Sequence, residues 1–305
     1  MSKRCKRMAE VAVENIRARA DAMRAQADAV KAEDPDGVHD MRVASRRLRA
    51  VVDEYRPALD KKASKALLKS VRAVTRTLGR PRELDVMLAT LARHRNALQS
   101  GARTAANHAL RRIRARRRAV AMSCREAAAI VSSAAFEELL SALLASAVPT
   151  RDCLLDHMRR SLKKKYDRLC NAYTAWKETG KEERLHEVRI AFKKLRYACE
   201  AHAECYGDRM TRFLKRLKDV QQLLGDWNDL RVLRLELTDI AWELPDPMRA
   251  GLPDLIAAVG RPCAELETAF AAHAEQFFSK SRRRSTRQLF QTPTITCCAE
   301  KTSKS

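Results

Sequence analysis

An internal duplication is the sequence feature that most constrains how this chain folds. The segment VHDMRVASRRLR at 38–49 returns 147 residues later as LHEVRIAFKKLR at 185–196, with the chemistry kept position by position. A second segment, LGRPRELDV at 78–86, returns at a spacing of 146 as LGDWNDLRV at 224–232. The two pairs occur in the same order, which is typical of one structural unit that is present twice.

Each copy is predicted to be helical. The 305 residues contain only 8 glycines and 9 prolines, and a hydrophobic content of 46% is enough to bury a core. Apolar residues recur at helical spacing between Pro and Gly punctuation, which predicts helices at 6–33, 36–56, 60–78, 82–98, 103–131, 135–146, 152–178, 183–206, 209–224, 228–243 and 249–277.

The expected fold class is therefore all-α. We predict two helical bundles from the duplicated unit, related by pseudo-two-fold symmetry, within one domain at 6–278. The first repeat covers about 6–147 and the second about 148–278. The segment at 279–305 begins with a run of basic residues and ends rich in Thr, Ser and Lys, which favours a disordered basic tail.

The charge balance indicates an anionic partner. Lys and Arg number 61 against 38 Asp and Glu, a formal net charge of +23, and a compact chain with this charge repels itself unless an anion offsets it. Aromatic residues make up only 5%, which weighs against single-strand binding by base stacking. The anion is thus expected to be recognised through phosphate groups.

The first repeated segment gathers cations on one helix face. At 100° per residue its basic residues share one side of the helix in each copy, and apolar residues such as Met41, Leu48, Val188 and Leu195 occupy the other. The basic residues are His39, Arg42, Arg46, Arg47, Arg49, His186, Arg189, Lys193, Lys194 and Arg196. No carboxylate interrupts this face. A solvated surface is the simpler interpretation for one such helix, but its retention in both copies favours a ligand-binding face.

The following helix in each repeat adds a second basic stripe. In the first repeat it contains Lys69, Arg72 and Arg76, preceded by Lys62 and Lys65, and in the second repeat Lys215 and Lys218 are the counterparts of Lys69 and Arg72. Arg112, Arg116, Lys163 and Lys164 are candidates to extend it. Paired antiparallel helices can present adjoining stripes, so we expect a positive groove or channel for an extended polyanion.

At these residues the sequence resembles the CHAD family, the conserved histidine α-helical domains. The resemblance rests on the two His-x-x-Arg-[VI]-x-x-[RK]-[RK]-Leu-Arg motifs and the two Leu-Gly segments, and it covers nearly all of 6–278. It implies two four-helix bundles with a basic central channel that binds inorganic polyphosphate, and an association with polyphosphate granules. The cations of both motifs carry over as the ligand face. At position 83 this sequence has Glu where the family commonly has Asp, and Asn228 occupies the position that is equivalent to Arg82 in the first repeat.

Other functional classes find less support. The nine cysteines are odd in number and scattered, and Cys199, His202 and Cys205 would point to different faces of one helix, so neither disulfides nor a metal or cofactor site are expected. The basic face holds no nucleophile with a base and no carboxylate pair, so no enzyme activity is predicted. The N-terminus resembles no secretory signal and no apolar run spans a membrane, which favours a cytoplasmic protein, with granules as its expected location.

Non-enzymatic binding of inorganic polyphosphate is therefore the leading hypothesis. An architectural nucleic-acid-binding protein is the alternative, because the block at 111–118 holds six arginines. An enzyme that hydrolyses or extends polyphosphate and a granule-surface adaptor remain open as further alternatives. The two histidines are interpreted as donors to phosphate, or else as residues that only cap or pack at the helix start.

Overall fold

The structure is a computed structural model that describes residues 8–148, 154–243 and 249–294. These residues form helices and connecting turns without any strand, so the predicted all-α class is confirmed. The first repeat contains α1 (Met8–Arg24), α2 (Ala27–Lys31), α3 (Pro35–Glu54), η1 (Arg56–Ala58), α4 (Lys61–Thr77), α5 (Gly79–Arg95), α6 (Ser100–Ala119), α7 (Ala121–Ser132) and α8 (Ala134–Ala145). The second contains α9 (Leu154–Thr179), α10 (Glu182–Ala201), η2 (Ala203–Cys205), α11 (Asp208–Glu243), α13 (Leu252–Phe277) and α14 (Lys280–Gln291).

Local capping sets the start of the helices that carry the basic residues of the first repeat. Asp34 caps α3 by accepting a hydrogen bond from the backbone N–H of Gly37 at 2.9 Å, and Pro35 occupies the first turn, where its missing N–H costs nothing. Asp60 caps α4 by accepting from the N–H of Ala63 at 2.7 Å. The starts of these two helices therefore agree with the sequence prediction.

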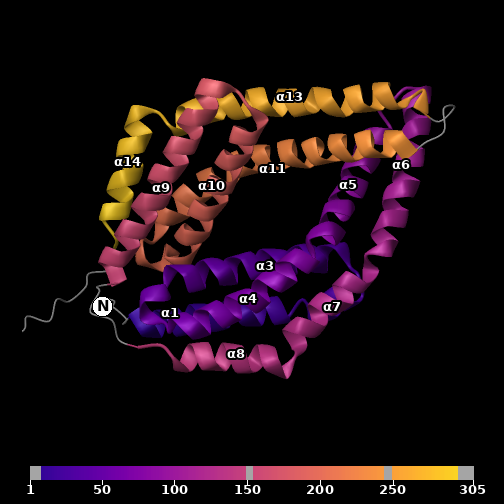
Figure 1. Cartoon of the computed structure of the whole chain (residues 1–305). Helices are drawn as coiled ribbons and strands as arrows, with labels where there is room; N and C mark the ends of the chain where they lie inside the picture. The colour runs from indigo at the N-terminus through magenta and orange to yellow at the C-terminus, as the bar shows by residue number, and fades with distance from the viewer. Residues whose placement is uncertain (1–7, 149–153, 244–248, 295–305) are drawn as a thin grey trace, which may run out of the picture.

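The helices are arranged as a four-sided frame (Figure 1). Along one side lie α1, α3, α4 and α8, and along the opposite side lie α11 and α13. At one end α5 and α6 of the first repeat pack against α11 and α13 of the second, and at the other end α10 packs against α3. The two repeats thus contact each other at both ends of the frame.

One continuous hydrophobic core runs through both repeats. Buried residues from all the major helices form a single cluster, which includes Tyr55 and Leu48 in the first repeat and Trp227 and Phe192 in the second. Each Å² of apolar surface that is buried stabilises a fold by about 25 cal/mol, so this core makes the main stabilising contribution. The basic faces of α3 and α10 are the sides of these helices that the core leaves uncovered.

The second Leu-Gly segment does not break a helix, contrary to prediction. The sequence predicts separate helices at 209–224 and 228–243, whereas α11 runs without interruption from Asp208 to Glu243 through Gly225. A glycine inside a helix costs about 1 kcal/mol relative to alanine, and α11 offsets this by packing along α13 with Leu224 and Trp227 fully buried. In the first repeat Pro81 follows the equivalent glycine, and the chain there divides into α4 and α5.

Three other expectations need correction. The helix predicted at 6–33 divides into α1 and α2, and the one predicted at 103–131 divides into α6 and α7. Most importantly, the segment predicted as a disordered tail forms helix α14 over Lys280–Gln291. Residues 295–305 of that segment lie outside the described residues.

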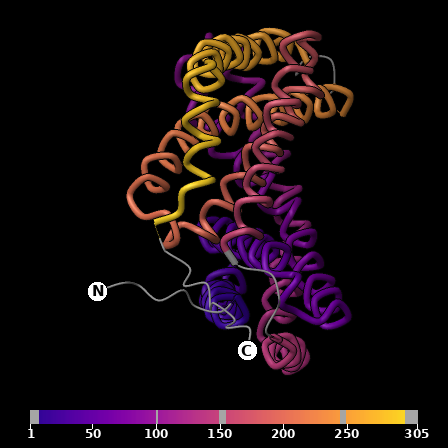
Figure 2. The backbone as a smooth tube through the Cα atoms, turned by 90° about the vertical axis from the view of Figure 1, so that its left-hand side faces the viewer, coloured from indigo at the N-terminus to yellow at the C-terminus, as the bar shows by residue number. Residues whose placement is uncertain are grey.

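Apolar contacts explain why α14 is ordered. Its Leu289 and Phe290 are buried, and the Phe290 ring makes an edge contact with Tyr166 of α9 at a centroid distance of 5.9 Å. The hydroxyl of Tyr206 donates a hydrogen bond to the Phe290 carbonyl at 3.0 Å. Figure 2 shows α14 running alongside α9. In the sequence of α14, the apolar residues Leu289 and Phe290 follow the run of basic residues. The basic run by itself favoured disorder, which is why the helix was not predicted.

No single helix in the described part of the chain combines the length and apolar character that a membrane crossing needs. The bent pair at Gly101–Ser132 and Ala134–Ala145 passes the same test of length and composition when its two parts are taken together.

Candidate functional site

A cavity of about 480 Å³ lies between the two repeats. All four sides of the frame contribute to it, because its walls come from α3, α5, α10 and α11. Six of the predicted site residues line it: His39, Arg42, Arg46, His186, Arg189 and Lys193. The structure thus brings the equivalent positions of both copies of the first motif to a single cavity.

Arg42 is the first-repeat cation whose position is most firmly fixed. Its Nη1 donates a 2.6 Å hydrogen bond to the Thr75 carbonyl near the end of α4, where carbonyl groups are not all used within the helix. Burial and, after it, the neighbouring charge of Arg46 lower the pKa of Arg42 to about 10. Removing a guanidinium from water beside another cation disfavours the charged form, so this arrangement favours a bound anion.

The second-repeat cations are crowded in the same way. Burial lowers the pKa of Lys193 to about 7, with added contributions from the charges of Arg189 and Arg46. Burial also holds the pKa of Arg189 below its ordinary value, and its buried Nε has no hydrogen-bond partner among the described residues. An unsatisfied buried donor costs free energy that an acceptor such as a phosphate oxygen would recover.

The two histidines occupy equivalent positions at the start of the basic faces. Burial is the main cause that lowers the pKa of each, followed by the charge of Arg82 for His39 and of Arg189 for His186. His186 Nδ1 donates to Asn228 Oδ1 at 3.3 Å, which leaves Nε2 for another partner. Both rings are therefore neutral near pH 7 in the free protein.

Carboxylates and further cations, which the sequence analysis missed as site residues, also line the cavity. Arg82 and Arg231 belong to the second repeated segment, as do Glu83, Asp226 and Asp229. Asp226 and Asp229 both lie inside α11 and not at a helix start. Burial raises the pKa of Asp229, while the charge of Arg189 opposes that shift.

Charged residues recur in both copies of the second repeated segment, and this recurrence was the sequence signal that could have identified them as site residues. Arg42 lies near Glu83, and Arg189 lies near Asp229. The first arginine of each His-x-x-Arg motif therefore has an acidic neighbour from the second segment of its own repeat. Six Arg and Lys side chains still face three carboxylates among the residues that line the cavity. The site is therefore mixed in sign but positive on balance.

Arg47 and Arg196 pair with an acidic residue and do not line the cavity. Glu200 of α10 accepts from Arg47 Nε at 2.9 Å and lies 3.1 Å from Arg196 Nε. The expectation of a face without carboxylates therefore fails at this end, because Glu200 comes four residues after the motif. The pair of Arg47 and Glu200 connects α3 to α10 across the repeats, whereas Arg196 and Glu200 both belong to α10.

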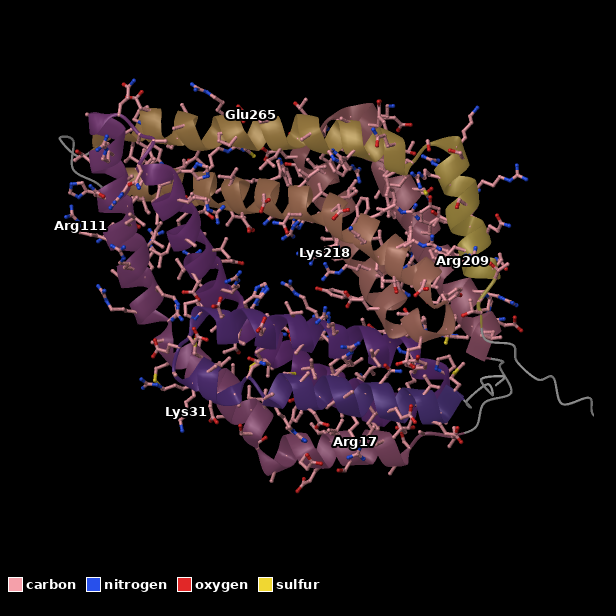
Figure 3. All side chains as sticks on the ribbon, turned by 180° about the vertical axis from the view of Figure 1, so that it is seen from behind. Arg17, Lys31, Arg111, Arg209, Lys218 and Glu265 are labelled. Atoms are coloured by element: carbon pink, nitrogen blue, oxygen red, sulfur yellow. The ribbon has the colours of Figure 1, made fainter. Side chains whose placement is uncertain are left out.

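The remaining predicted residues do not line the cavity. Arg49 lies near Arg72, whose charge helps burial to lower the Arg49 pKa, so the stripes of α3 and α4 do adjoin. Lys69, Arg72, Arg76, Lys215 and Lys218 are exposed on α4 and α11, and Figure 3 labels Lys218 on α11. Lys194 points elsewhere, into a groove of about 230 Å³ between α9 and α10.

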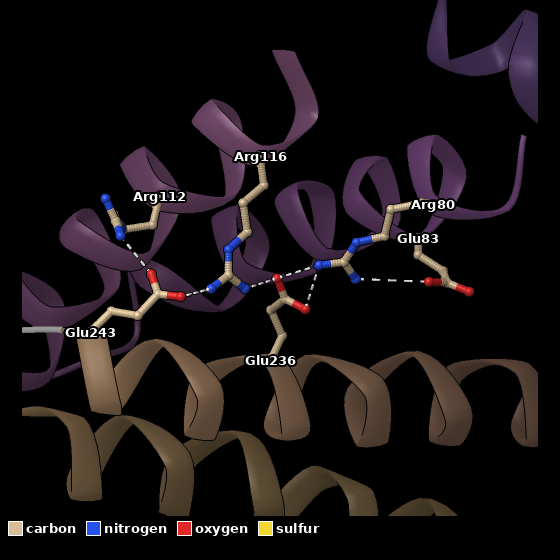
Figure 4. A network of polar contacts seen from close by, with 6 residues as sticks. All are labelled: Arg80, Glu83, Arg112, Arg116, Glu236 and Glu243. Atoms are coloured by element: carbon tan, nitrogen blue, oxygen red, sulfur yellow. Dashed lines mark hydrogen bonds and ion pairs between the residues drawn. The ribbon is translucent and has the colours of Figure 1, made fainter. Parts of the chain in front are cut away.

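Arg112 and Arg116 do not extend the basic surface. They form ion pairs with Glu243, and Arg116 also pairs with Glu236, which accepts from Arg80 at 2.7 Å (Figure 4). This network links α5 and α6 to α11 across the repeats. Of the other two candidates, Lys163 pairs with Asp167 at 2.7 Å, and Lys164 is exposed on α9.

Within the described ranges, no group of three or more His, Cys, Asp or Glu side chains could hold a metal ion. His202 instead lies 3.0 Å from Glu54 through Nε2 and 3.3 Å from the Tyr55 hydroxyl through Nδ1, and Cys199 and Cys205 are buried.

Comparisons with known proteins agree with this architecture. The family model described as CHAD domain matches residues 14–238. The crystal structure of the CHAD domain from the plant Ricinus communis is similar, with a TM-score of 0.62, 21% identity and 97% of each chain covered. PptA from Streptomyces chartreusis is also similar, with a TM-score of 0.65 and 20% identity over 88% of this chain and 100% of that one. No curated protein sequence matches the chain. Because the family match spans well over half of the chain, this protein belongs to the CHAD domain family.

Proposed function

We propose that this protein binds inorganic polyphosphate, without chemical turnover, in the cavity between its two repeats. The observation that carries the proposal is the meeting of Arg42, Arg46, Arg189 and Lys193 at one cavity, crowded together and partly withdrawn from water. Like charges held this close destabilise the free protein, and a polyanion offsets that cost. Membership of a family associated with polyphosphate supports this choice of ligand.

A flexible phosphate chain suits this mixture of cations. Arginine forks bind phosphate oxygens through paired hydrogen bonds, and lysine acts as a point charge that tolerates many ligand positions. The exposed stripes of α4 and α11 continue the positive surface beyond the cavity, so a long chain meets further cations as it leaves. We further propose polyphosphate granules as the place where this binding occurs.

Binding without turnover is supported by the side chains at the cavity. Its lining consists of basic, acidic, amide and apolar residues and includes no Ser, Thr or Cys that could act as a nucleophile. Incubation with long-chain polyphosphate and a divalent cation should therefore release no phosphate and leave the chain length unchanged. Shortened or extended chains would contradict this part of the proposal.

Duplex nucleic acid is a poorer fit than polyphosphate. A cavity of about 480 Å³ cannot admit a duplex, whose major groove alone is about 12 Å wide. In the arginine block of α6, moreover, Arg112, Arg116 and Arg117 are held in ion pairs with acidic residues. Arg111 projects outward from the frame, away from α11 (Figure 3).

Competition at physiological salt tests this choice of ligand. Labelled long-chain polyphosphate should be displaced by unlabelled polyphosphate at far lower phosphate concentration than by duplex DNA, because only the flexible chain reaches the cavity. Equal displacement by both competitors at equal phosphate concentration would favour the nucleic-acid alternative. Salt must be fixed throughout, since binding dominated by phosphate contacts weakens steeply as salt rises.

The lowered pKa of Lys193 predicts that polyphosphate affinity depends on pH. With a pKa of about 7, the amine is mostly charged at pH 6 and mostly neutral at pH 8 in the free protein. A bound phosphate favours the charged form, so binding takes up a proton, and the affinity should fall by about tenfold from pH 6 to pH 8. Titrations of wild type and Lys193→Arg measure the effect. The variant, which keeps its charge, should lose this fall, and an identical pH profile would contradict the assignment.

A further inference from the structure

A second cationic pocket lies where α11, α13 and α14 meet. It encloses about 130 Å³ and is lined by Arg216 of α11, His273 of α13 and Arg282 of α14, among others. The central cavity shares none of these residues. The helix α14 that completes the pocket lies beyond residue 238, where the CHAD domain match ends.

The arginines of this pocket lack acidic partners. In the described part of the chain, no carboxylate lies within ion-pair distance of Arg216, Arg282 or the neighbouring Arg212. Burial lowers the pKa of Arg216, and the charges of Arg282 and then Arg212 lower it further. One carboxylate, Asp219, lines the pocket. Two guanidinium groups, those of Arg216 and Arg282, line the pocket against this one carboxylate, so the pocket is positive on balance.

The floor of the pocket strengthens its attraction for an anion. Phe213, Val220 and Phe277 form an apolar base, and charges interact more strongly beside such low-dielectric surfaces than in bulk water. The guanidinium of Arg216 lies over the Phe213 ring at 5.7 Å, which holds this side chain in place. His273 Nδ1 donates to the Ala269 carbonyl at 2.9 Å, so Nε2 is the ring nitrogen left for a ligand.

We propose that this pocket is a second anion site, which binds a single phosphoryl group of a small inorganic phosphate through Arg216 and Arg282. Its volume corresponds to about four water molecules at their share of liquid volume, which suits orthophosphate or pyrophosphate and is too small to enclose a long chain. Arginine forks match the geometry of phosphate oxygens. The protein would then bind short phosphates and long chains at separate places.

Calorimetric titration of the full chain with pyrophosphate tests the site. The Arg46→Gln/Lys193→Gln background weakens the central cavity and should retain pyrophosphate binding at one site per chain. Adding Arg282→Gln to this background should weaken that binding by about tenfold or more, because it removes a charged hydrogen-bond donor. Arg284→Gln removes an exposed arginine from the same helix and should change nothing. Since Arg282 is itself exposed, its replacement leaves the fold intact.

Three results would overturn the second site. The first is loss of all pyrophosphate binding in the background with Arg282 intact, and the second is unchanged affinity after Arg282→Gln. The third concerns the source of the phosphoryl group. Orthophosphate and pyrophosphate should both respond to Arg282→Gln, whereas a response confined to long-chain polyphosphate would make the cluster part of the polyphosphate surface. The cavity substitutions should change the binding of long-chain polyphosphate but not that of pyrophosphate, and Arg282→Gln should do the reverse. Failure of the second site can therefore be distinguished from failure of the central cavity.

Discussion

Replacing Arg42, Arg46, Arg189 and Lys193 together by glutamine should weaken the binding of long-chain polyphosphate by at least about a thousandfold. Each residue lines the cavity between the repeats and offers a charged donor to a phosphate oxygen. Such hydrogen bonds contribute about 1.5–3 kcal/mol each when they involve a charged group, so four losses exceed the roughly 4 kcal/mol that a thousandfold change requires, even when they are not additive. Fluorescence or calorimetric titration at fixed salt measures the change.

The fourfold cavity variant should stay folded. The cavity cations are crowded together and withdrawn from water, so neutralising them relieves repulsion in the free protein. Helical circular dichroism should be unchanged, and the thermal midpoint should be equal to or higher than that of wild type. Normal binding by a folded fourfold variant would contradict the cavity assignment.

A matched control separates the cavity from overall charge. Arg17, Arg114, Arg118 and Arg284 are exposed and lie outside the cavity, and replacing all four by glutamine removes the same net charge. This variant should lose far less affinity, because distant surface charges are largely screened at physiological salt. An equal loss in both variants would mean that net charge, and not position, determines binding.

Glu54→Ala should destabilise the protein by about 3–5 kcal/mol, the largest effect expected on stability. Glu54 at the end of α3 is 2% exposed, and its carboxylate accepts from Ser161 at 2.7 Å and lies 3.0 Å from His202 Nε2. Lys165 of α9 forms an ion pair with it. Removing the carboxylate leaves His202 Nε2 buried without this partner and takes a partner from the half-buried Ser161 and Lys165. Denaturant unfolding followed by circular dichroism measures the loss.

The neighbouring residue provides the control for Glu54. Asp53→Ala breaks an ion pair with Arg56 in which both side chains are largely exposed, so it should change stability by less than about 1 kcal/mol. Comparable destabilisation by the two variants would show that the Glu54 cluster does not hold the repeats together.

Acid titration gives an independent signature of Glu54. Burial alone would raise its pKa, but the hydrogen bond and charge of His202 and the charge of Lys165 outweigh burial and lower the pKa to about 2. Because the folded-state pKa lies below the ordinary value of 4.5, Glu54 stabilises the fold above pH 4.5, and this contribution is lost as the pH falls toward 2. It amounts to about 3 kcal/mol, and Glu54→Gln should lack this part of the acid dependence.

The duplication and the helical periodicity predicted much of the fold. They placed α3 and α10 as equivalent helices, with their basic sides opposite the core, and the break at Pro35 marked the start of α3. They did not predict that α11 continues through Gly225, because long-range packing against α13 outweighs the local preference of one glycine. The ordering of α14 depends in the same way on contacts of Phe290 with distant helices.

The cavity was less predictable than the helices that form it. His39, Arg42, Arg46 and their counterparts were found because they repeat on one face. The pairing of Glu200 with Arg47 joins residues 153 positions apart, and helical periodicity contains no information about such contacts. Arg82 was missed because the second repeated segment was predicted to lie at a break between helices, whereas both of its copies contribute to the walls of the cavity.

A crystal structure of the full chain with long-chain polyphosphate bound is the most direct test of the central claim. We expect phosphate density inside the cavity between the repeats, with phosphate oxygens within hydrogen-bond distance of both Arg42 and Arg189 and of Lys193. Density that lies only on the outer surface, for example along the exposed arginines of α6 or α14, with the cavity free of phosphate, would contradict the account.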